Sequence, residues 1–311
     1  MKKTYRIGVD LGGTNIATGL VDENNKVVDK ISCKTGLPRP AHDLEQAIAQ
    51  QCRSLAQKNN LSLEQNIEWV GIGTPGSVDS STGYVEFNAN FGYHQWELKK
   101  DMEALLPCPV FIENDANAAA YGEYIAGGAK GAKSAVVIII DGKIFSGYNY
   151  AGAELGHTVI VKGGRPCMCG RRGCWEAYAS ATGLIRMTRE AMEAHPESLL
   201  HTVAAQSGCV EGRTAFDAAA QGDETALALC REYVSYLAAG VTNLINILQP
   251  EAVAIGGGVA AAPDGLLLTP LREIVERECY PRHTGQIPRI VRAELGNDAG
   301  IIGAALLKRA I

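Results

Sequence analysis

Three apolar, β-branched runs at the start of the chain constrain its fold more than any other feature. Residues 5–12 and Asn15–Val21 meet at a glycine turn, and a third run follows at Val27–Lys34 after a polar turn at 23–26. Apolar runs bounded by glycine and polar turns are typical of β-strands. The sequence therefore predicts an opening meander of three strands.

Helical spacing and further buried strands follow the meander. Apolar residues recur at helical spacing over 44–56, with Asp43 as the expected N-cap. The other predicted elements are strands at 69–73, 110–113, 252–255 and 290–295, and helices at 97–106, 116–125, 224–248 and 298–309, the last capped by Asp298. Alternation of strands and helices predicts a mixed α/β fold.

Composition and charge exclude several classes of function. Hydrophobic residues make up 46% of the 311 residues and charged residues 20%, which is the usage of a folded globular protein. The formal net charge is −5 and Lys or Arg forms no long run, so no nucleic-acid partner is expected. The start of the chain lacks the apolar core of a secretory signal, and no apolar run approaches the roughly 20 residues of a membrane helix. We therefore expect a cytoplasmic protein that does not bind membranes.

The glycine turn between the first two strands has the sequence DLGGTN. Because Gly12 and Gly13 lack a Cβ, the backbone N–H groups up to Thr14 and Asn15 can approach a phosphate, and Asp10 can hold Mg²⁺. A tight hairpin without a ligand accounts for the same residues. The dinucleotide-binding fingerprint is excluded because its glycines open a helix, whereas a strand follows here.

A second polar segment, with the sequence ENDAN, follows the strand expected at 110–113. Open α/β folds bind ligands at the carboxyl ends of their strands. Asp115 can therefore accept a proton from a substrate hydroxyl. Asn114 and Asp115 are also suited to cap the helix that follows, a role that this segment alone slightly favours and that can coexist with the first.

The most specific signal in the residues themselves is the spacing H-x9-C-x-C-x4-C. It is formed by His157, Cys167, Cys169 and Cys174. Three thiolates and one imidazole fit the closed tetrahedral shell of a structural Zn²⁺, although a loop of free thiols is the alternative. A closed shell leaves no position for substrate, so the metal would brace the loop and fix the flanking carboxylates of Glu154 and Glu176.

Three consecutive glycines, Gly256, Gly257 and Gly258, follow the strand expected at 252–255. Such a turn can lie against the adenosine of a nucleotide. A plain turn between a strand and a helix fits the spacing at least as well.

Five motifs, in a fixed order, resemble those of the ROK family, whose name joins repressors, open reading frames and kinases. They are DLGGTN at 10–15, GTPGSVD at 73–79, ENDANAAA at 113–120, ELGH at 154–157 and CMCGRRGCWEAY at 167–178. The resemblance runs through nearly the whole chain. Within the family it is greatest to the ATP-dependent bacterial glucokinases.

The resemblance implies a two-lobed actin-like ATPase fold, related to ribonuclease H, with the active site in the cleft between the lobes. We expect the N-terminal lobe at 1–117, joined by the C-terminal helix at 298–311, and the C-terminal lobe with the zinc loop at 118–297. A homodimer is also implied.

The resemblance further implies the roles of individual residues. Asp115 is the general base that takes the proton of the sugar 6-hydroxyl, while Asn114, Glu154, His157 and Glu176 hold other hydroxyls. ATP and Mg²⁺ are the implied cofactors beside structural Zn²⁺, with the glycine turns at 12–15 and 256–258 and Asp10 on the nucleotide side.

One motif of the family is missing. Similar kinases carry a glycine-rich phosphate loop, L-G-T-G-x-G-G-G, where this chain reads SAVVIIIDGKIF at 134–145. Roughly ten residues are absent near Ile138 and Ile139, a normal length for a loop. Either the protein lacks the loop, and with it backbone donors for the γ-phosphate, or residues are missing from the sequence. We favour the second explanation because fusing two strands directly would disrupt the sheet.

The leading hypothesis is an ATP:hexose 6-phosphotransferase of carbohydrate metabolism and glycolysis. Glucose is the expected sugar, and mannose or an N-acetylated hexosamine is the alternative. A ROK-type sugar-responsive regulator is less favoured because it needs a DNA-binding extension before Asp10. A catalytically silent sugar-binding protein is the third reading, supported only by the missing loop.

Overall fold

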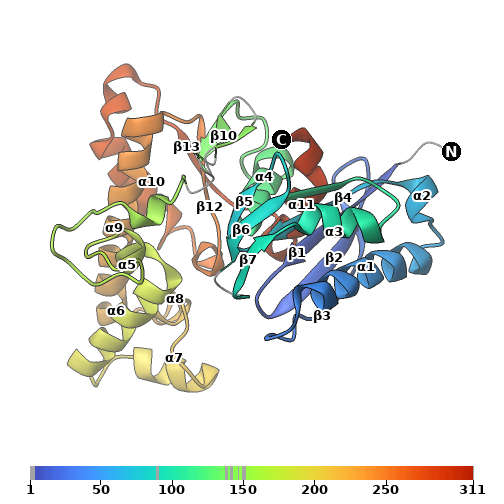
Figure 1. Ribbon diagram of the computed structural model, residues 1–311. Helices are drawn as coiled ribbons and strands as arrows, with labels where there is room; N and C mark the ends of the chain where they lie inside the picture. Colours follow the sequence, from blue (N-terminus) through green and yellow to red (C-terminus); the bar gives the residue numbers. More distant parts are fainter. Residues whose placement is uncertain are drawn as a thin grey trace. The chain divides into compact units, whose positions relative to one another are not determined.

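A computed structural model describes residues 4–88, 91–136, 139–140, 143–145, 147–148 and 152–310. Contacts within the chain divide it into two compact units, Met1–Ala153 with Glu294–Ile311, and Glu154–Ala293. The first unit is therefore built from two separate stretches of sequence and the second from one. In Figure 1 the C-terminal residues of the first unit, in red, lie beside its blue and green elements.

A five-stranded sheet lies at the centre of the first unit. Its strands, in spatial order, are β3 (Val27–Lys34), β2 (Asn15–Val21), β1 (Tyr5–Leu11), β4 (Ile67–Thr74) and β8 (Val110–Asn114). The first three are antiparallel, and β4 and β8 run parallel to β1. Asp10 pairs with Gly73, and Gly73 pairs with Glu113. The polar sequences after β1 and β8 therefore reach the same edge of the sheet.

Helices and short strands complete the first unit. They are α1 (Ala41–Lys58), α2 (Leu63–Asn66), β5 (Ser77–Asp79), β6 (Tyr84–Asn88), β7 (Tyr93–Trp96), α3 (Leu98–Leu105), α4 (Asp115–Ala126), β9 (Ala135–Val136), β10 (Ile139–Ile140), β11 (Lys143–Ile144) and α11 (Ala299–Leu306), followed by a 3-10 turn at Leu307–Arg309. Strands β5, β6 and β7 form a separate antiparallel sheet.

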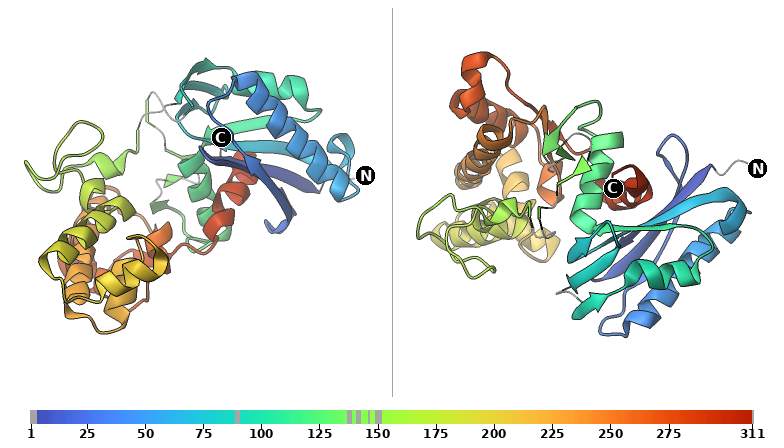
Figure 2. Two further views of the ribbon diagram at one scale, coloured as in Figure 1. Left: turned by 90° about the horizontal axis from the view of Figure 1, so that it is seen from below. Right: turned by 45° about the horizontal axis from the view of Figure 1, so that its top comes forward.

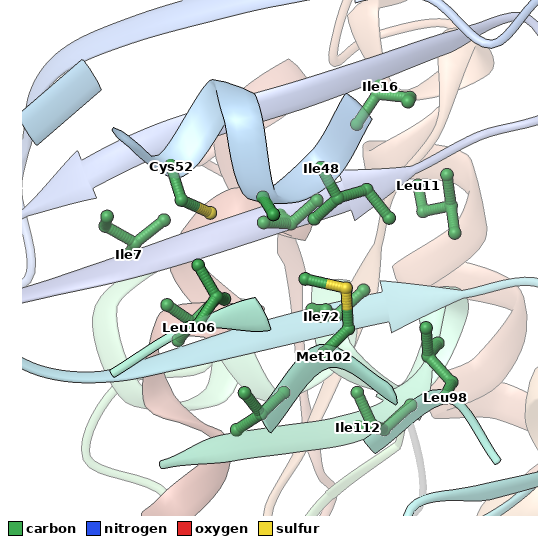
Figure 3. Close-up of a cluster of buried hydrophobic side chains, with 14 of the residues drawn as sticks. Ile7, Leu11, Ile16, Ile48, Cys52, Ile72, Leu98, Met102, Leu106 and Ile112 are labelled. Carbon is green, nitrogen blue, oxygen red and sulfur yellow. The ribbon is translucent and has the colours of Figure 1, made fainter. Parts of the chain in front are cut away.

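One face of the central sheet carries the main hydrophobic core. Alternate residues of β1, from Ile7 to Leu11, are fully buried on this face, as the period of two in a strand requires. Helices α1 and α3 cover it, and Figure 3 shows Ile48 of α1 and Met102 of α3 among the buried side chains of the strands.

The backbone of α11 lies directly against the other face of the sheet. A Cβ added at Gly8 would lie 1.8 Å from the carbonyl oxygen of Ile301, and one at Gly71 would lie 1.8 Å from that of Ala304. No side chain can occupy that space, so only glycine permits this approach. Helix α4 packs beside α11.

The carboxylate of Glu123 in α4 holds the segment that leads into α11. Its Oε1 accepts a hydrogen bond from the Leu295 N–H at 2.7 Å, and its Oε2 accepts from the Gly128 and Glu294 N–H groups at 3.0 and 2.9 Å. Glu123 is buried, so these donors replace the water that a carboxylate otherwise requires.

The segment expected to lack a phosphate loop forms a small antiparallel ribbon. Ala135 of β9 pairs with Ile139 of β10, and Ile140 pairs with Lys143 of β11. Ile138, one of the two positions named for the missing loop, lies outside the described residues. Two residues of sequence separate β9 from β10.

The second unit is mostly helical. Its elements are a 3-10 turn at Leu155–His157, α5 (Glu176–Ala179), α6 (Ala181–Ala194), α7 (Leu200–Ser207), α8 (Thr214–Ala220), α9 (Glu224–Leu248), β12 (Ala252–Ile255), α10 (Leu268–Glu278) and β13 (Arg289–Arg292). Helix α9 begins where the Asp223 side chain accepts the Ala226 N–H at 2.7 Å. Figure 2 shows α9 packed against the neighbouring helices α5, α6 and α8, in yellow to orange. Strands β12 and β13 are parallel.

Most predicted elements are confirmed, with four corrections. Helix α1 begins after Pro40, so Asp43 lies in its first turn and is not the N-cap. Asp298 occupies the N-cap position of α11 but makes no side-chain cap bond, and its carboxylate pairs with Lys30 at 2.7 Å. The strand expected at 290–295 ends at Arg292. The α-helical part of the last helix ends at Leu306.

The lobe boundary expected between residues 117 and 118 stays a prediction. In the division by contacts, α4 belongs to the first unit. Over the described part of the chain, every helix is too short or too polar to span a bilayer.

Substitution of Gly71 tests the contact between α11 and the sheet. Gly71→Ala should lower the free energy of unfolding by about 1–3 kcal/mol, because its methyl group collides with the Ala304 carbonyl. Gly265→Ala, where an added Cβ meets no atom within 4 Å, is the control. Denaturant titration measures both, and equal stability of the two variants would contradict the contact.

Candidate functional site

The turn after β1 is a tight hairpin that remains open to solvent. Its closure comes from the Gly12 N–H, which donates to the Asn15 carbonyl at 2.9 Å, and from the Thr35 hydroxyl, which donates to the Gly12 carbonyl at 2.6 Å. Gly13, Thr14 and Asn15 are exposed. DLGGTN thus forms the tight hairpin that was one of its two interpretations. The exposed residues of this turn remain accessible to a phosphate.

Asp115 is the first residue of α4, at the carboxyl edge of the sheet. Asn114 caps this helix, since its side chain accepts the Ala116 and Asn117 N–H groups at 3.0 and 3.2 Å. A Cβ added at Gly73 of β4 would lie 3.3 Å from the Asp115 Cα. Glycine at this position therefore lets Asp115 approach the strand closely. The capping expected for Asn114 is confirmed.

The half-buried carboxylates of Asp10 and Asp115 lie at this edge, in surroundings that disfavour their charged form. Burial raises the pKa of the Asp10 carboxyl above its ordinary value, and the negative charge of Asp115 raises it further. Burial also raises the pKa of the Asp115 carboxyl, and the Ala116 N–H partly opposes the shift. Asp115 is therefore a stronger base than an exposed aspartate, and a cation beside Asp10 would relieve the repulsion.

The side chain of Glu113 accepts hydrogen bonds from residues at this edge, a role that the sequence analysis did not predict. It is 2% exposed, and its Oε1 accepts hydrogen bonds from the Asn114 N–H at 2.8 Å and the Asn117 Nδ2 at 3.1 Å. Burial raises the pKa of its carboxyl. The signal available in the sequence was a lone carboxylate at the end of an otherwise apolar strand.

The four expected metal ligands come together in the second unit. The donor atoms of His157, Cys167, Cys169 and Cys174 all lie within 4.8 Å of one another. Cys167 Sγ lies 3.5 Å from His157 Nδ1, and Cys169 Sγ lies 3.6 Å from Cys174 Sγ. Ligand atoms around a tetrahedral Zn²⁺, with sulfur at about 2.3 Å, are about 3.7 Å apart. The donor set and its spacing therefore fit this ion.

Glu154 and Glu176 lie on either side of the ligand set, and both are exposed. Glu176 Oε1 is 3.9 Å from Cys167 Sγ, and Glu154 Oε2 is 4.0 Å from His157 Nε2. The two imidazole nitrogens of His157 thus face different groups, Nδ1 toward the thiols and Nε2 toward a carboxylate. This arrangement suits one nitrogen for a metal and the other for a ligand.

The three-glycine turn follows β12, and all three residues are exposed. Gly257 has a φ of 76°, in the left-handed region that favours glycine. The turn belongs to the second unit, as do Glu154, His157 and Glu176, whereas Asp10, Asn114 and Asp115 belong to the first.

Comparisons with known proteins agree with the motifs. Residues 6–311 match the model of the ROK family. A glucokinase of Thermotoga maritima is 37% identical over 316 residues, covering 98% of this chain and 97% of the relative. The crystal structure of a ROK family glucokinase from Streptomyces griseus in complex with glucose and AMPPNP is 34% identical, with a TM-score of 0.78, over 97% of this chain and 98% of that one.

A ROK hexokinase structure from Thermus thermophilus is 31% identical, with a TM-score of 0.77 and 97% of each chain covered. These structures confirm the predicted α/β class and the actin-like ATPase, ribonuclease H-like fold. The match along almost the entire sequence, together with the identity to these relatives, shows that the chain belongs to the ROK family.

Proposed function

We propose that this protein catalyses the ATP-dependent phosphorylation of a hexose, with glucose converted to glucose 6-phosphate. The 37% identity to a glucokinase over 98% of the chain carries the proposal. Phosphoryl transfer requires positioning, charge neutralisation and a group that takes the hydroxyl proton. Mannose and N-acetylated hexosamines are the alternative substrates.

Asp115 is the proposed general base, acting on the sugar 6-hydroxyl. Its raised pKa makes the carboxylate a better proton acceptor than an exposed aspartate. Asn114 would contact the sugar through its amide nitrogen. One hydrogen of Nδ2 goes to the Gly76 carbonyl at 3.0 Å, and the second can donate to a sugar hydroxyl.

The proposed nucleotide contacts are the two glycine turns. Backbone N–H groups at 12–15 would meet phosphate oxygens, and the turn at 256–258 would meet the adenosine. Asp10 would hold Mg²⁺, directly or through water, and the ion would neutralise charge on the phosphates. The raised pKa of Asp10 supports a cation there, since its carboxylate is otherwise poorly solvated.

Structural Zn²⁺ at the four-ligand set completes the proposed sugar site. The ion would brace the loop, and Glu154, His157 and Glu176 would hold sugar hydroxyls. The resemblance to ROK kinases also supports a cytoplasmic homodimer, which we include in the proposal.

Asp115→Asn should lower kcat for glucose by about 10²–10⁴-fold, because an amide cannot accept the proton. A coupled ADP assay over a panel of hexoses measures this and identifies the sugar. The variant should melt at the same or a higher temperature at neutral pH, since the carboxylate lost is one whose raised pKa disfavours its charged form.

Asp43→Asn, on an exposed residue of α1, is the matched control and should keep wild-type turnover. Undiminished turnover of Asp115→Asn would exclude Asp115 as the base.

Removal of one metal ligand tests the zinc site. Cys169→Ser should lower the zinc content from one ion per chain and raise the sugar KM, with less effect on the ATP KM, because the flanking carboxylates lose their support. Atomic emission and steady-state kinetics measure the two effects. The exposed Cys209 offers the control variant Cys209→Ser. Active wild-type protein without stoichiometric zinc would contradict the site.

Intact mass distinguishes the two explanations for the missing phosphate loop. The alignment to the Thermotoga glucokinase runs over 316 residues, more than this chain contains, so the alignment leaves gaps in this chain. If residues are missing from the sequence, as we expect, the natural protein will be heavier than 33.0 kDa. A mass of 33.0 kDa would mean that the loop is absent, and turnover should then be severely reduced.

A further inference from the structure

The indole of Trp175 occupies a notch in α9 that a glycine creates. A Cβ added at Gly240 would lie 1.9, 2.2 and 2.4 Å from three atoms of the indole. The Trp175 Nε1–H donates to the Tyr236 carbonyl at 2.9 Å. Shape on one side and a hydrogen bond on the other therefore fix the indole on the helix.

The residues of α5 dock on the same stripe of α9. Tyr233, Tyr236 and Gly240 are spaced three and four apart, so they share one helix face. The Tyr233 hydroxyl donates to the Ala179 carbonyl at 2.8 Å, and the ring of Tyr236 lies 4.6 Å from that of Tyr178. Helix α5 is thus held to α9 through the residue before it and through its last two residues.

Glu176 lies in the chain between two residues that dock on α9, Trp175 and Tyr178. The chain passes from the ligand Cys174 through Trp175 to Glu176 in three consecutive residues. The Glu176 side chain is exposed, and its Oε1 lies 3.9 Å from Cys167 Sγ. The backbone at Glu176 therefore sets where this carboxylate can reach, and a metal at the four-ligand set would fix that backbone on one side only.

Gly240 is unfavourable for the helix in which it lies. It is an interior residue of the 25-residue helix α9, where alanine would stabilise the helical backbone. The space that glycine leaves is the space that the indole fills. The residue therefore serves the contact with Trp175 at the expense of helix propensity.

We infer that Trp175 and Gly240 form a positioning pair that aims the Glu176 carboxylate and thereby sets the affinity for sugar. This inference rests on the proposed function, in which Glu176 holds a sugar hydroxyl. Trp175 is a positioning residue and acts through Glu176.

Gly240→Ala tests the pair with a single methyl group. We expect the glucose KM to rise between about tenfold and a hundredfold, because a carboxylate displaced by about 1 Å loses its contact. kcat and the ATP KM should change little, and the zinc content should stay at the wild-type value. Gly212→Ala is the control, since its nearest neighbour would be Ala181 Cβ at 3.7 Å.

A second substitution separates positioning from general damage. Trp175→Phe combined with Gly240→Ala makes room for the methyl group, so the glucose KM of the double variant should lie closer to the wild-type value than that of Gly240→Ala. A glucose KM unchanged in Gly240→Ala, an equal rise of the KM for ATP, or loss of zinc would each overturn the inference.

Failure of the inference and failure of the proposed function are distinguishable. If the wild-type protein phosphorylates no hexose in the panel, the proposed function is wrong. If the wild-type protein is active and Gly240→Ala keeps its glucose KM, only the positioning pair is wrong.

Discussion

The contact of α11 with the backbone of β1 and β4 is the constraint on which the first unit depends. Gly8 and Gly71 leave the space in which helix carbonyls meet the sheet, and larger residues would push the helix away. Helix α4 packs beside α11, so the helix that begins with Asp115 takes its place from the same contact. Main-chain packing on this face of the sheet therefore contributes to the position of its carboxyl edge, beside the side-chain hydrogen bonds of Glu113 and Asn114.

Two ionised carboxylates at that edge of the sheet lower the stability of the folded protein. Asp10 and Asp115 both have raised pKa values, so the folded protein binds protons at these groups more tightly than the unfolded chain does. The resulting contribution favours the folded state only at low pH and opposes it once the carboxyls ionise. Sites that bind cations and phosphates commonly accept such a cost, because the ligand removes it. The buried Glu113 adds a third carboxyl to the same region.

Local patterns were sufficient for part of this description. Strands β2, β3 and β12 and helix α9 have the predicted bounds, and the spacing of the metal ligands anticipated their convergence. The cap expected for α1 was wrong because the helix begins at Ala41, two residues before Asp43, so that Asp43 lies inside its first turn. The roles of Glu113 and Gly240 could not be predicted, since each depends on partners supplied by another element. A glycine in a helix gives no sign of which side chain fills the space it leaves.

The two-part construction of the first unit has a consequence for biosynthesis. Residues 154–293 are contiguous, so every residue of this unit is made before the C-terminal stretch of the first unit. The first unit lacks α11 until nearly the whole chain is made, and Glu123 lacks its donors from Glu294 and Leu295 for equally long. The helix that meets Gly8 and Gly71 is therefore among the last parts of the chain to be made. The contact that holds the first unit together can form only after the residues of the second unit have been synthesised.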